Sequence, residues 1–495
     1  MEQVKKDFKE YLEKISLLDE ILSTINFDNE IYAPEGGVLT RSKRISYLEV
    51  EIFSMKVSEK MKYFLDELGK ELDNLDTITK AMVRNAKREY DKNTKIPKEL
   101  VKEMSEAKTK AFIAWDKARK ENNFKEFAPH LKSLIDLQKK MISYRAINGE
   151  NAYEILLDDY EKGMDIQTYD KLFTEYKEIA VPLLKKIQEK KQIDSSYINE
   201  EVPIEMQEKI SEFIAAKLGY KLNNGLIAVA AHPFCNPIDK YDVRITTRYD
   251  EKDFLSSLYS VAHETGHALY EQNIGDELLG TGLEGGVSMG IHESQSRFYE
   301  NMIGRSEEFW DYIAEELKTY LPEKFKNLSP DKFFKAANKA LASFIRVEAD
   351  ELTYSIHILI RYEIEKMIFT EEVNIEDLPK VWNKKYEEYL GITPPTDSVG
   401  VLQDIHWSYA YFGYFPTYFL GSAYAAQFFA KKENAKELIR EGKFDEITKW
   451  LEENIHRHGM VYDPNDLVQN FIGEPLNVKY YTDYLTEKFT KIYNL

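Results

Sequence analysis

The feature that most constrains this chain is a pair of histidines, His263 and His267, that flank Glu264 in a stretch without proline, residues 253–272. Apolar residues precede and follow the pair, so the stretch is predicted to form a buried helix. At about 100° per residue, positions four apart lie on one helix face, and both imidazoles can therefore reach a single ion. The spacing predicts a metal site bordered by the Glu264 carboxylate.

The plainer interpretation is a pair of half-buried structural histidines. With nine His in 495 residues, chance produces this five-residue pattern in roughly one or two such chains per hundred. The flanking residues decide between the two, because a buried helix rarely carries two His and a Glu on one face without partners. Two nitrogen ligands, with a carboxylate placed to take a proton from water that the ion activates, are what a zinc hydrolase needs.

A catalytic zinc site needs a third protein ligand and an open position. A glycine-rich loop, residues 280–290, follows the first helix, and residues 291–301 are again helical in pattern. Glu293 or His292 is the natural third ligand from this second helix. Glu284 is a weaker candidate because it lies in the glycine-rich loop.

Composition restricts the remaining classes of function. The net charge is −19 without an evident basic stripe, which argues against a nucleic-acid partner. The single cysteine, Cys235, excludes an intrachain disulfide framework and suits a reducing compartment. Residues 407–430 carry no charge, but their glycines, proline and tyrosines favour a buried wall beside the site over a membrane span. We expect a protein that is cytoplasmic and makes no membrane contact.

The texture of the sequence changes near residue 225. Residues 1–224 are mainly helical in period and are predicted to form a scaffold or cover, whereas residues 225–495 hold the metal site and substrate groove. Residues 226–230 and 243–248 are short and β-branched, which predicts two strands joined through residues 232–238. A small antiparallel sheet beside the site can hold an extended peptide by main-chain hydrogen bonds.

Arg346 is a charged residue in an apolar stretch that is predicted to be helical, residues 345–350. Arg346 either binds an anionic ligand or forms a buried ion pair with a nearby acid. The candidate acids are Glu348, Asp350 and Glu351. Further along the chain, the side chains that can donate to a developing oxyanion are His406, Tyr414 and Tyr418. Taken singly, each of these three is more often a satisfied core residue. We assign no chemistry to His456 or His458.

Six motifs in this order are very specific. They are His232-Pro-Phe234, Asp242-Val-Arg-Ile-Thr246, His263-Glu-Thr-Gly-His267, His292-Glu-Ser-Gln295 followed by Arg297, Ile345-Arg-Val-Glu-Ala-Asp350 and Gly400-Val-Leu-Gln-Asp-Ile-His-Trp407. With them, the sequence resembles the carboxypeptidase Taq family of zinc metallocarboxypeptidases along nearly its whole length.

The resemblance implies one catalytic domain over residues 1–495. Its fold would be mainly helical and two-lobed with a deep central groove, similar to neurolysin and the angiotensin-converting enzymes. It also implies cytosolic homodimers that remove single residues from peptide C-termini with broad specificity. The expected cofactor is zinc, replaceable by Co²⁺ or another divalent ion.

The resemblance also implies roles for single residues. Zinc would be held by His263, His267 and Glu293, with Glu264 as general base and acid. For the oxyanion we favour Tyr418 or His406. An exopeptidase must bind a free carboxylate, which a buried guanidinium does with two hydrogen bonds. The candidates for contact with substrate are Arg346 first, then Arg244 and Arg248, and also His232.

Two other classes stay open on the sequence. A zinc oligopeptidase or dipeptidyl carboxypeptidase would use the same chemistry in another cleavage register, and the released fragments distinguish it. A non-catalytic helical binding protein would hold structural zinc or none, and metal analysis with an activity assay distinguishes that.

Overall fold

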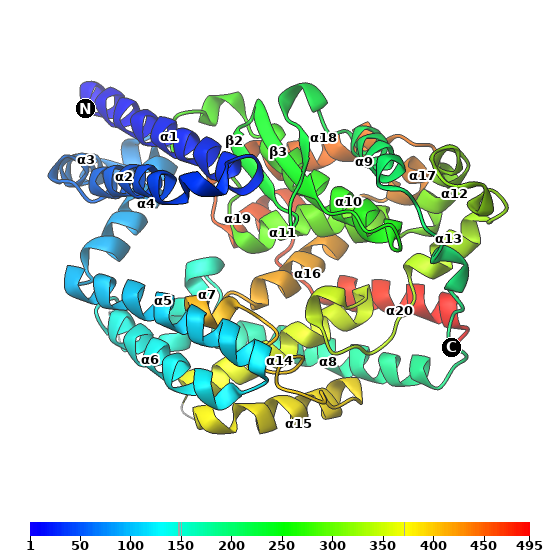
Figure 1. Cartoon of the computed structure of the whole chain (residues 1–495). Helices are drawn as coiled ribbons and strands as arrows, with labels where there is room; N and C mark the ends of the chain where they lie inside the picture. Colours follow the sequence, from blue (N-terminus) through cyan, green and yellow to red (C-terminus); the bar gives the residue numbers. More distant parts are fainter. Residues whose placement is uncertain (147–148, 150, 371) are drawn as a thin grey trace. The chain divides into compact units, whose positions relative to one another are not determined.

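The chain forms two compact units, each assembled from segments far apart in sequence. The computed structural model (Figure 1) describes residues 1–146, 149, 151–370 and 372–495. Unit 1 comprises residues 1–94, 194–337 and 428–475, and unit 2 comprises residues 95–193, 338–427 and 476–495. The division expected at residue 224 is therefore not a unit boundary, because both halves of the sequence contribute to both units.

Both units are mainly helical, as predicted. The helices of unit 1 are α1 (Glu2–Ile31), α2 (Val38–Lys56), α3 (Glu59–Gly69), α4 (Thr77–Thr94), α9 (Ile204–Leu218), α10 (Phe254–Gln272), α11 (Met289–Arg297), α12 (Glu307–Leu317), α13 (Pro330–Ala337), α17 (Ala435–Arg440), α18 (Phe444–Asn454) and α19 (Pro464–Leu467). Unit 2 holds α5 (Lys98–Glu121), α6 (Phe124–Ser143), α7 (Ala152–Tyr160), α8 (Ile166–Gln188), α14 (Glu351–Phe369), α15 (Leu378–Leu390), most of α16 (Pro416–Lys431) and α20 (Lys479–Tyr493).

Within the described ranges, three strands form one sheet in unit 1. They are β1 (Ile227–Val229), β2 (Cys235–Asp239) and β3 (Asp242–Thr247), in the order β1-β3-β2. β1 runs parallel to β3, and β2 runs antiparallel to it. The prediction of an antiparallel sheet is therefore wrong in part, because the segment expected to join two strands is itself a strand. Pro237 lacks an N–H donor, and β2 accommodates it as an edge strand with an irregular register.

The helix predicted around the two histidines is α10. It begins at Phe254, where the side chain of Asp253 accepts a hydrogen bond from the backbone N–H of Ser256 at 3.2 Å and so satisfies an unpaired N–H of the first turn. Val261 and Ala268 of α10 pack against the sheet, and both side chains are fully buried. This packing confirms the prediction of a buried helix and fixes which face of α10 points away from the sheet.

α11 lies against another face of α10 at very short range. Ser288 caps its first turn by accepting from the N–H of Ile291 at 3.1 Å. A Cβ atom at Gly266 of α10 would stand 2.4 Å from the carbonyl oxygen of Gln295 and 2.7 Å from the Cα of Ser296. Gly266 thus allows the two helix backbones to touch. The predicted helix 291–301 ends earlier as α-helix, and residues 298–303 form a π-helical turn.

The N-terminal helices pack on the segment that follows α10. Phe8, Leu12 and Ile15 of α1 share one hydrophobic cluster with Leu278 and Leu283. These apolar residues recur at steps of four and three along α1, which places them on one face of the helix. α2 and α3 are separate helices, because Ser58 caps α3 by accepting from the N–H of Met61 at 3.0 Å.

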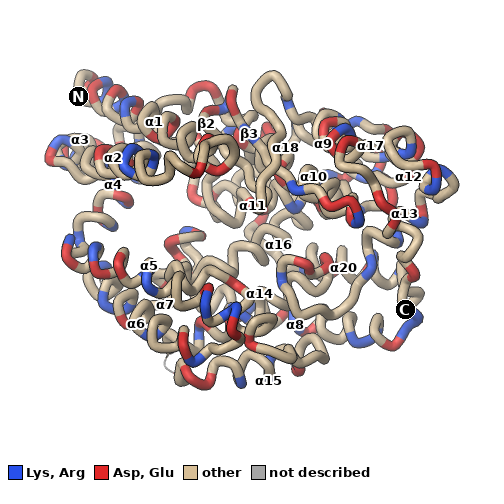
Figure 2. Tube along the Cα trace, viewed as in Figure 1, with Lys and Arg blue, Asp and Glu red and all other residues tan. Residues whose placement is uncertain are grey.

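In unit 2, Arg346 lies in a short 3-10 turn and not in the helix predicted over residues 345–350. The helix begins only at Glu351, since the side chain of Asp350 accepts from the N–H groups of Leu352 and Thr353. α16 carries no charged residue before Lys431, and most of its residues are buried. Within the described ranges, no helix combines the length and the apolar character needed to cross a bilayer. Figure 2 shows acidic and basic residues interspersed along the helices of both units.

Replacing Gly266 with Ala is expected to lower the free energy of unfolding by about 1–3 kcal/mol and to reduce bound metal. The reason is that the new methyl group would force α10 and α11 apart. Denaturant unfolding and metal analysis check this. Gly69→Ala, at the last position of α3, is the matched control because nothing lies within 4 Å of its Cβ position. Equal stability of the two variants would contradict the close approach.

Candidate metal centre

α10 and α11 bring three metal-binding side chains together. His263 and His267 come from α10 and Glu293 from α11, and one ligand atom of each lies within 4.8 Å of the others. The Oε2 atom of Glu293 is 3.7 Å from Nε2 of His263 and 3.5 Å from Nε2 of His267. All three groups belong to unit 1.

This donor triangle fits a divalent ion. Zinc is held by His nitrogens and carboxylate oxygens at about 2.0–2.2 Å in tetrahedral geometry, for which neighbouring ligand atoms lie roughly 3.3–3.6 Å apart. The two nitrogen–oxygen separations match this spacing closely. Three protein ligands leave the fourth position open, as catalysis requires.

A second carboxylate orients His263. Nδ1 of His263 lies 2.9 Å from Oε2 of Glu300, and an imidazole that donates from Nδ1 leaves its Nε2 lone pair for a metal. Arg297 donates to Glu300 at 3.2 Å and also to Glu293 at 2.7 Å. Arg305 donates to the other oxygen of Glu300 at 3.3 Å. One ion-pair network thus holds both the third ligand, Glu293, and the carboxylate that orients His263, Glu300.

His267 is oriented by a relay through a third imidazole. Its Nδ1 lies 2.6 Å from Nδ1 of His292, whose Nε2 lies 2.7 Å from Oε1 of Glu271. Because the Glu271 carboxylate accepts the Nε2 proton of His292, Nδ1 of His292 is left as an acceptor. His267 then donates from Nδ1 and turns its bare Nε2 toward Glu293. The sequence left His292 open as a ligand, whereas the structure places it behind His267.

The electrostatics of the cluster suit a cation. Burial lowers the pKa of His267 to about 3, which keeps it neutral. Burial also raises the pKa of Glu293, but Arg297 and His263 outweigh this and hold the carboxyl well below its usual range. For His263, burial lowers the pKa, whereas the carboxylates of Glu293 and Glu300 raise it and prevail. A bound metal therefore competes with a proton at His263.

Glu264 borders the cluster without belonging to the donor triangle. Its side chain is buried, and burial raises the pKa of its carboxyl to about 7. The imidazoles of His263 and His292 oppose this rise, and Glu293 adds to it. A carboxyl group that titrates near neutrality can both accept and return a proton.

Arg346, the first candidate for the substrate carboxylate, lies in unit 2 within a buried charge cluster. Its Nε donates to Oδ1 of Asp404 at 2.9 Å, and its Nη1 donates to the Tyr354 hydroxyl at 3.1 Å. Arg361 donates to the other oxygen of Asp404 at 2.7 Å. The ion-pair interpretation is thus correct in kind, but its predicted partners were wrong. Two guanidinium groups share one carboxylate, which leaves one positive charge in excess.

The candidate oxyanion donors lie in the same unit. The Arg346 guanidinium stands over the Tyr418 ring at 5.2 Å, and His406 packs edge-on to that ring at 6.3 Å. Tyr414 packs against both rings, with its own ring 5.5 Å from His406 and 5.3 Å from Tyr418. Burial lowers the pKa of His406 to about 4, so it is a neutral imidazole. Its buried Nδ1 has no hydrogen-bond partner among the described residues.

The other predicted residues are not members of the donor triangle. Arg244 forms a two-hydrogen-bond pair with Asp242 inside β3, at 2.8 and 2.7 Å. Arg248 is exposed just beyond the end of β3, and His232 is exposed between β1 and β2. Glu284 is half-buried in the glycine-rich loop and is not a member of the triangle.

Sequence reasoning missed the residues that support the site. Glu300 stands seven positions after Glu293, and Arg297 stands between them at four, so all three lie on one face. This spacing was a usable signal. His456 was expected to have no chemistry, but it is buried, and its Nε2 contacts Oε1 of Gln295 at 2.8 Å. No local pattern indicates that contact, because 161 residues separate the two.

The site combines two imidazole ligands with a carboxylate as the third ligand, and another carboxylate lies beside them. On packed helices, this arrangement defines the class of metal-dependent hydrolases. Comparison with known proteins gives the family. The profile of the carboxypeptidase Taq (M32) metallopeptidases matches residues 7–489. The chain belongs to this family and is a metallocarboxypeptidase, a peptide hydrolase.

Individual relatives match over nearly their whole length. Carboxypeptidase 1 of Bacillus subtilis (strain 168) is 44% identical over 496 residues, which cover 99% of both chains. Thermostable carboxypeptidase 1 of Pyrococcus furiosus is 36% identical over 99% of this chain and 98% of its own. The crystal structure of the M32 carboxypeptidase from Deinococcus radiodurans R1 has a TM-score of 0.96 at 31% identity and covers 100% of both chains.

Glu300→Gln is expected to weaken metal binding by roughly 10–100-fold, because the neutral amide orients the His263 imidazole less strongly. The metal dissociation constant, measured by titration of the metal-free protein, checks this. Glu308→Gln is the matched control, since Glu308 is another buried glutamate of unit 1 that pairs with an arginine, Arg440 at 2.8 Å. If both variants bind metal alike, Glu300 does not support the site.

Proposed function

We propose that this chain is a zinc-dependent carboxypeptidase that releases single amino acids from peptide C-termini with broad specificity. The observation that carries the proposal is the triangle of His263, His267 and Glu293 with its nitrogen–oxygen separations of 3.5 and 3.7 Å. Its matched spacing and its supporting network favour a bound ion over three unrelated buried residues.

The chain's own residues divide the remaining work. A bound divalent ion supplies a Lewis acid that polarises the scissile carbonyl and lowers the pKa of an attacking water. Glu264 accepts the proton of that water and passes it to the leaving amine, and its buried side chain borders the donor triangle. Tyr418 or His406 donates a hydrogen bond to the developing oxyanion.

In this proposal, the Arg346 guanidinium binds the free α-carboxylate of the peptide. A carboxylate takes two parallel hydrogen bonds from a guanidinium, and burial strengthens them. The support is the excess positive charge of the Arg346–Asp404–Arg361 cluster, whose arginines are nearly inaccessible to solvent. A substrate carboxylate would balance that charge.

Further parts of the proposal concern the fold, the assembly and the location. The two-lobed fold with a deep groove, like that of neurolysin and the angiotensin-converting enzymes, is carried over from the family resemblance. A homodimer is supported by exposed apolar side chains on the neighbouring helices α1 and α2, which are those of Leu17, Ile21, Leu39, Tyr47 and Val50. Sedimentation of the purified chain measures its mass in solution and so distinguishes a dimer from a monomer.

A cytoplasmic location is supported by the single cysteine.

Glu264→Gln should keep the bound metal but lose several orders of magnitude in kcat. General acid–base catalysis alone contributes about 10²–10⁴-fold, and the amide also fails to orient the water. His267→Ala should lose both activity and the metal, because the two remaining ligands hold the ion poorly. Metal analysis and peptide turnover, measured on both variants, check the division of roles. Loss of metal in Glu264→Gln would make Glu264 a ligand instead.

Amidating the C-terminus of a peptide substrate should reduce kcat/KM by roughly thirty- to several-thousand-fold for the unaltered enzyme. Arg346→Met should show little further loss on the amidated peptide, because the contact is already missing. Arg145→Met is the matched control, as another arginine of unit 2 that pairs with an aspartate, Asp159 at 2.6 Å. Mass spectrometry of the products tells whether single residues, dipeptides or internal fragments are released. Equal cleavage of free and amidated peptides would refute the exopeptidase proposal.

A further inference from the structure

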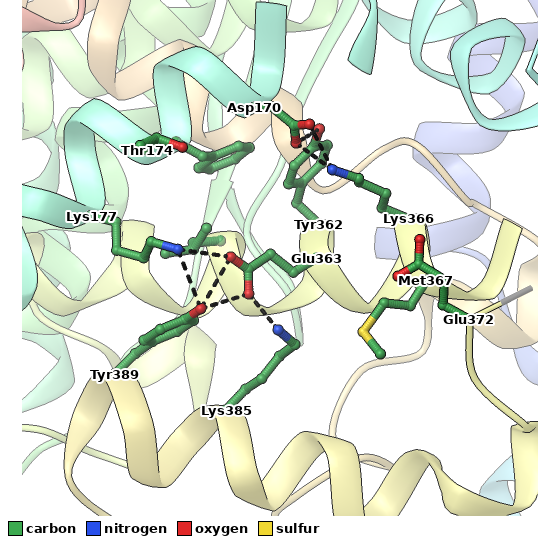
Figure 3. A pocket seen from close by; sticks show the side chains of 12 residues that line it. Asp170, Thr174, Lys177, Tyr362, Glu363, Lys366, Met367, Glu372, Lys385 and Tyr389 are labelled. Atoms are coloured by element: carbon green, nitrogen blue, oxygen red, sulfur yellow. Dashed lines mark hydrogen bonds and ion pairs between the residues drawn. The ribbon is translucent and has the colours of Figure 1, made fainter. Parts of the chain in front are cut away.

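Unit 2 contains a cavity of about 420 Å³ among α8, α14 and α15. This volume lies within the range of about 300–1,000 Å³ that is usual for small-molecule sites. Figure 3 shows its charged side chains pointing into a common space. The residues that line it are Asp170, Phe173, Thr174, Lys177, Leu359, Tyr362, Glu363, Lys366, Met367, Glu372, Lys385 and Tyr389.

The lining residues follow from helix geometry. Asp170, Thr174 and Lys177 stand at steps of four and three along α8, which places them on one face. Glu363 and Lys366 of α14 and Lys385 of α15 lie on the faces of their helices that line the same cavity. Three packed helices therefore hold the walls in place.

One end of the cavity carries an excess of positive charge. Lys177 pairs with Glu363 at 3.3 Å, and Lys385 contacts the other oxygen of the same carboxylate. The Tyr389 hydroxyl also donates to Glu363, at 2.8 Å. Two ammonium groups share one carboxylate here, and Figure 3 shows all three donors converging on it. A second carboxylate, brought by a ligand, would relieve the repulsion between the lysines.

The other end of the cavity is negative on balance. Asp170 accepts from Lys366 at 2.6 Å and from the Tyr362 hydroxyl at 2.8 Å, so this pair is neutral. Glu372 adds a carboxylate beside Met367, exposed to solvent (Figure 3). An ammonium group is attracted to this end and a carboxylate to the other.

Apolar surface connects the two ends. Phe173 of α8 and two residues of α14, Leu359 and Met367, complete the lining. Of these, Phe173 and Leu359 are buried. An apolar side chain on the ligand would therefore find a favourable surface between the charged groups.

We propose that this cavity binds a free α-amino acid with an apolar side chain. The carboxylate of the amino acid lies against Lys177 and Lys385, and its ammonium group lies toward Glu372 and Asp170. The side chain of the amino acid contacts Phe173 and Leu359. The binding site stands on the cavity alone and does not depend on the proposed function. If that function holds, the ligand belongs to the same chemical class as the released products.

The test measures binding of L-leucine to the metal-loaded enzyme by isothermal titration calorimetry. Two probes each lack one charge: 4-methylpentanoate lacks the ammonium group, and 3-methylbutylamine lacks the carboxylate. L-leucine should bind more tightly than either. Equal binding of 4-methylpentanoate would overturn the amino-acid assignment, since the ammonium group would then contribute nothing.

Variants separate this cavity from the metal centre. Lys177→Gln and Lys385→Gln should each weaken leucine binding roughly tenfold, the usual size of a lost hydrogen bond to a charged group. Thr174→Trp should abolish it by filling the cavity from an exposed position without changing charge. Lys335→Gln is the control, because Lys335 forms a similar helix-surface pair with Asp331 at 2.9 Å in unit 1.

Circular dichroism and thermal unfolding establish that each variant folds. Peptide hydrolysis without added leucine should be unchanged in all four variants, so the fate of this site is read separately from that of the proposed function. Identical leucine isotherms in the enzyme and in folded Thr174→Trp would overturn the site, whatever the hydrolysis assay shows.

Discussion

The contact between the backbones of α10 and α11 at Gly266 determines how the metal-binding residues meet. The two histidines are placed by the period of one helix, but the third ligand comes from a different helix across a loop. Only a residue without a side chain lets Glu293 approach both imidazoles within 3.5–3.7 Å. The sheet then supports α10 from another side through Val261 and Ala268. The site is rigid because packed elements, and not loops, carry its ligands.

Each unit buries charged groups and compensates them by networks that differ in sign. Around Glu300 in unit 1, arginines hold carboxylates in the ionised form that a cation requires. Around Asp404 in unit 2, two arginines share one carboxylate, and the balance is positive. Burial makes such an imbalance costly unless a ligand of the opposite sign completes it. One unit is therefore suited to a metal ion, and the other to an anion.

Local patterns predicted much of this structure, and long-range pairing was what they could not supply. The spacing of His263 and His267 and the apolar residues around them are enough to predict α10 and its metal-binding face. Proximity in sequence wrongly favoured Glu348, Asp350 or Glu351 as partners of Arg346, whereas Asp404 lies 58 residues away. The strand β2 was missed because its proline and polar residues give no alternating pattern. Helix periods are local, but the partners of buried charges depend on the whole fold.

The interleaving of the two units has a consequence for how the protein is made. The chain passes from one unit to the other after residues 94, 193, 337, 427 and 475. The metal-binding residues are synthesised well before residues 428–475, which complete their unit and include His456, the partner of Gln295. Unit 1 therefore cannot finish folding while the ribosome is still making its last segment, and no single cut releases either unit intact. Such long-range closure favours slow folding from a nearly complete chain.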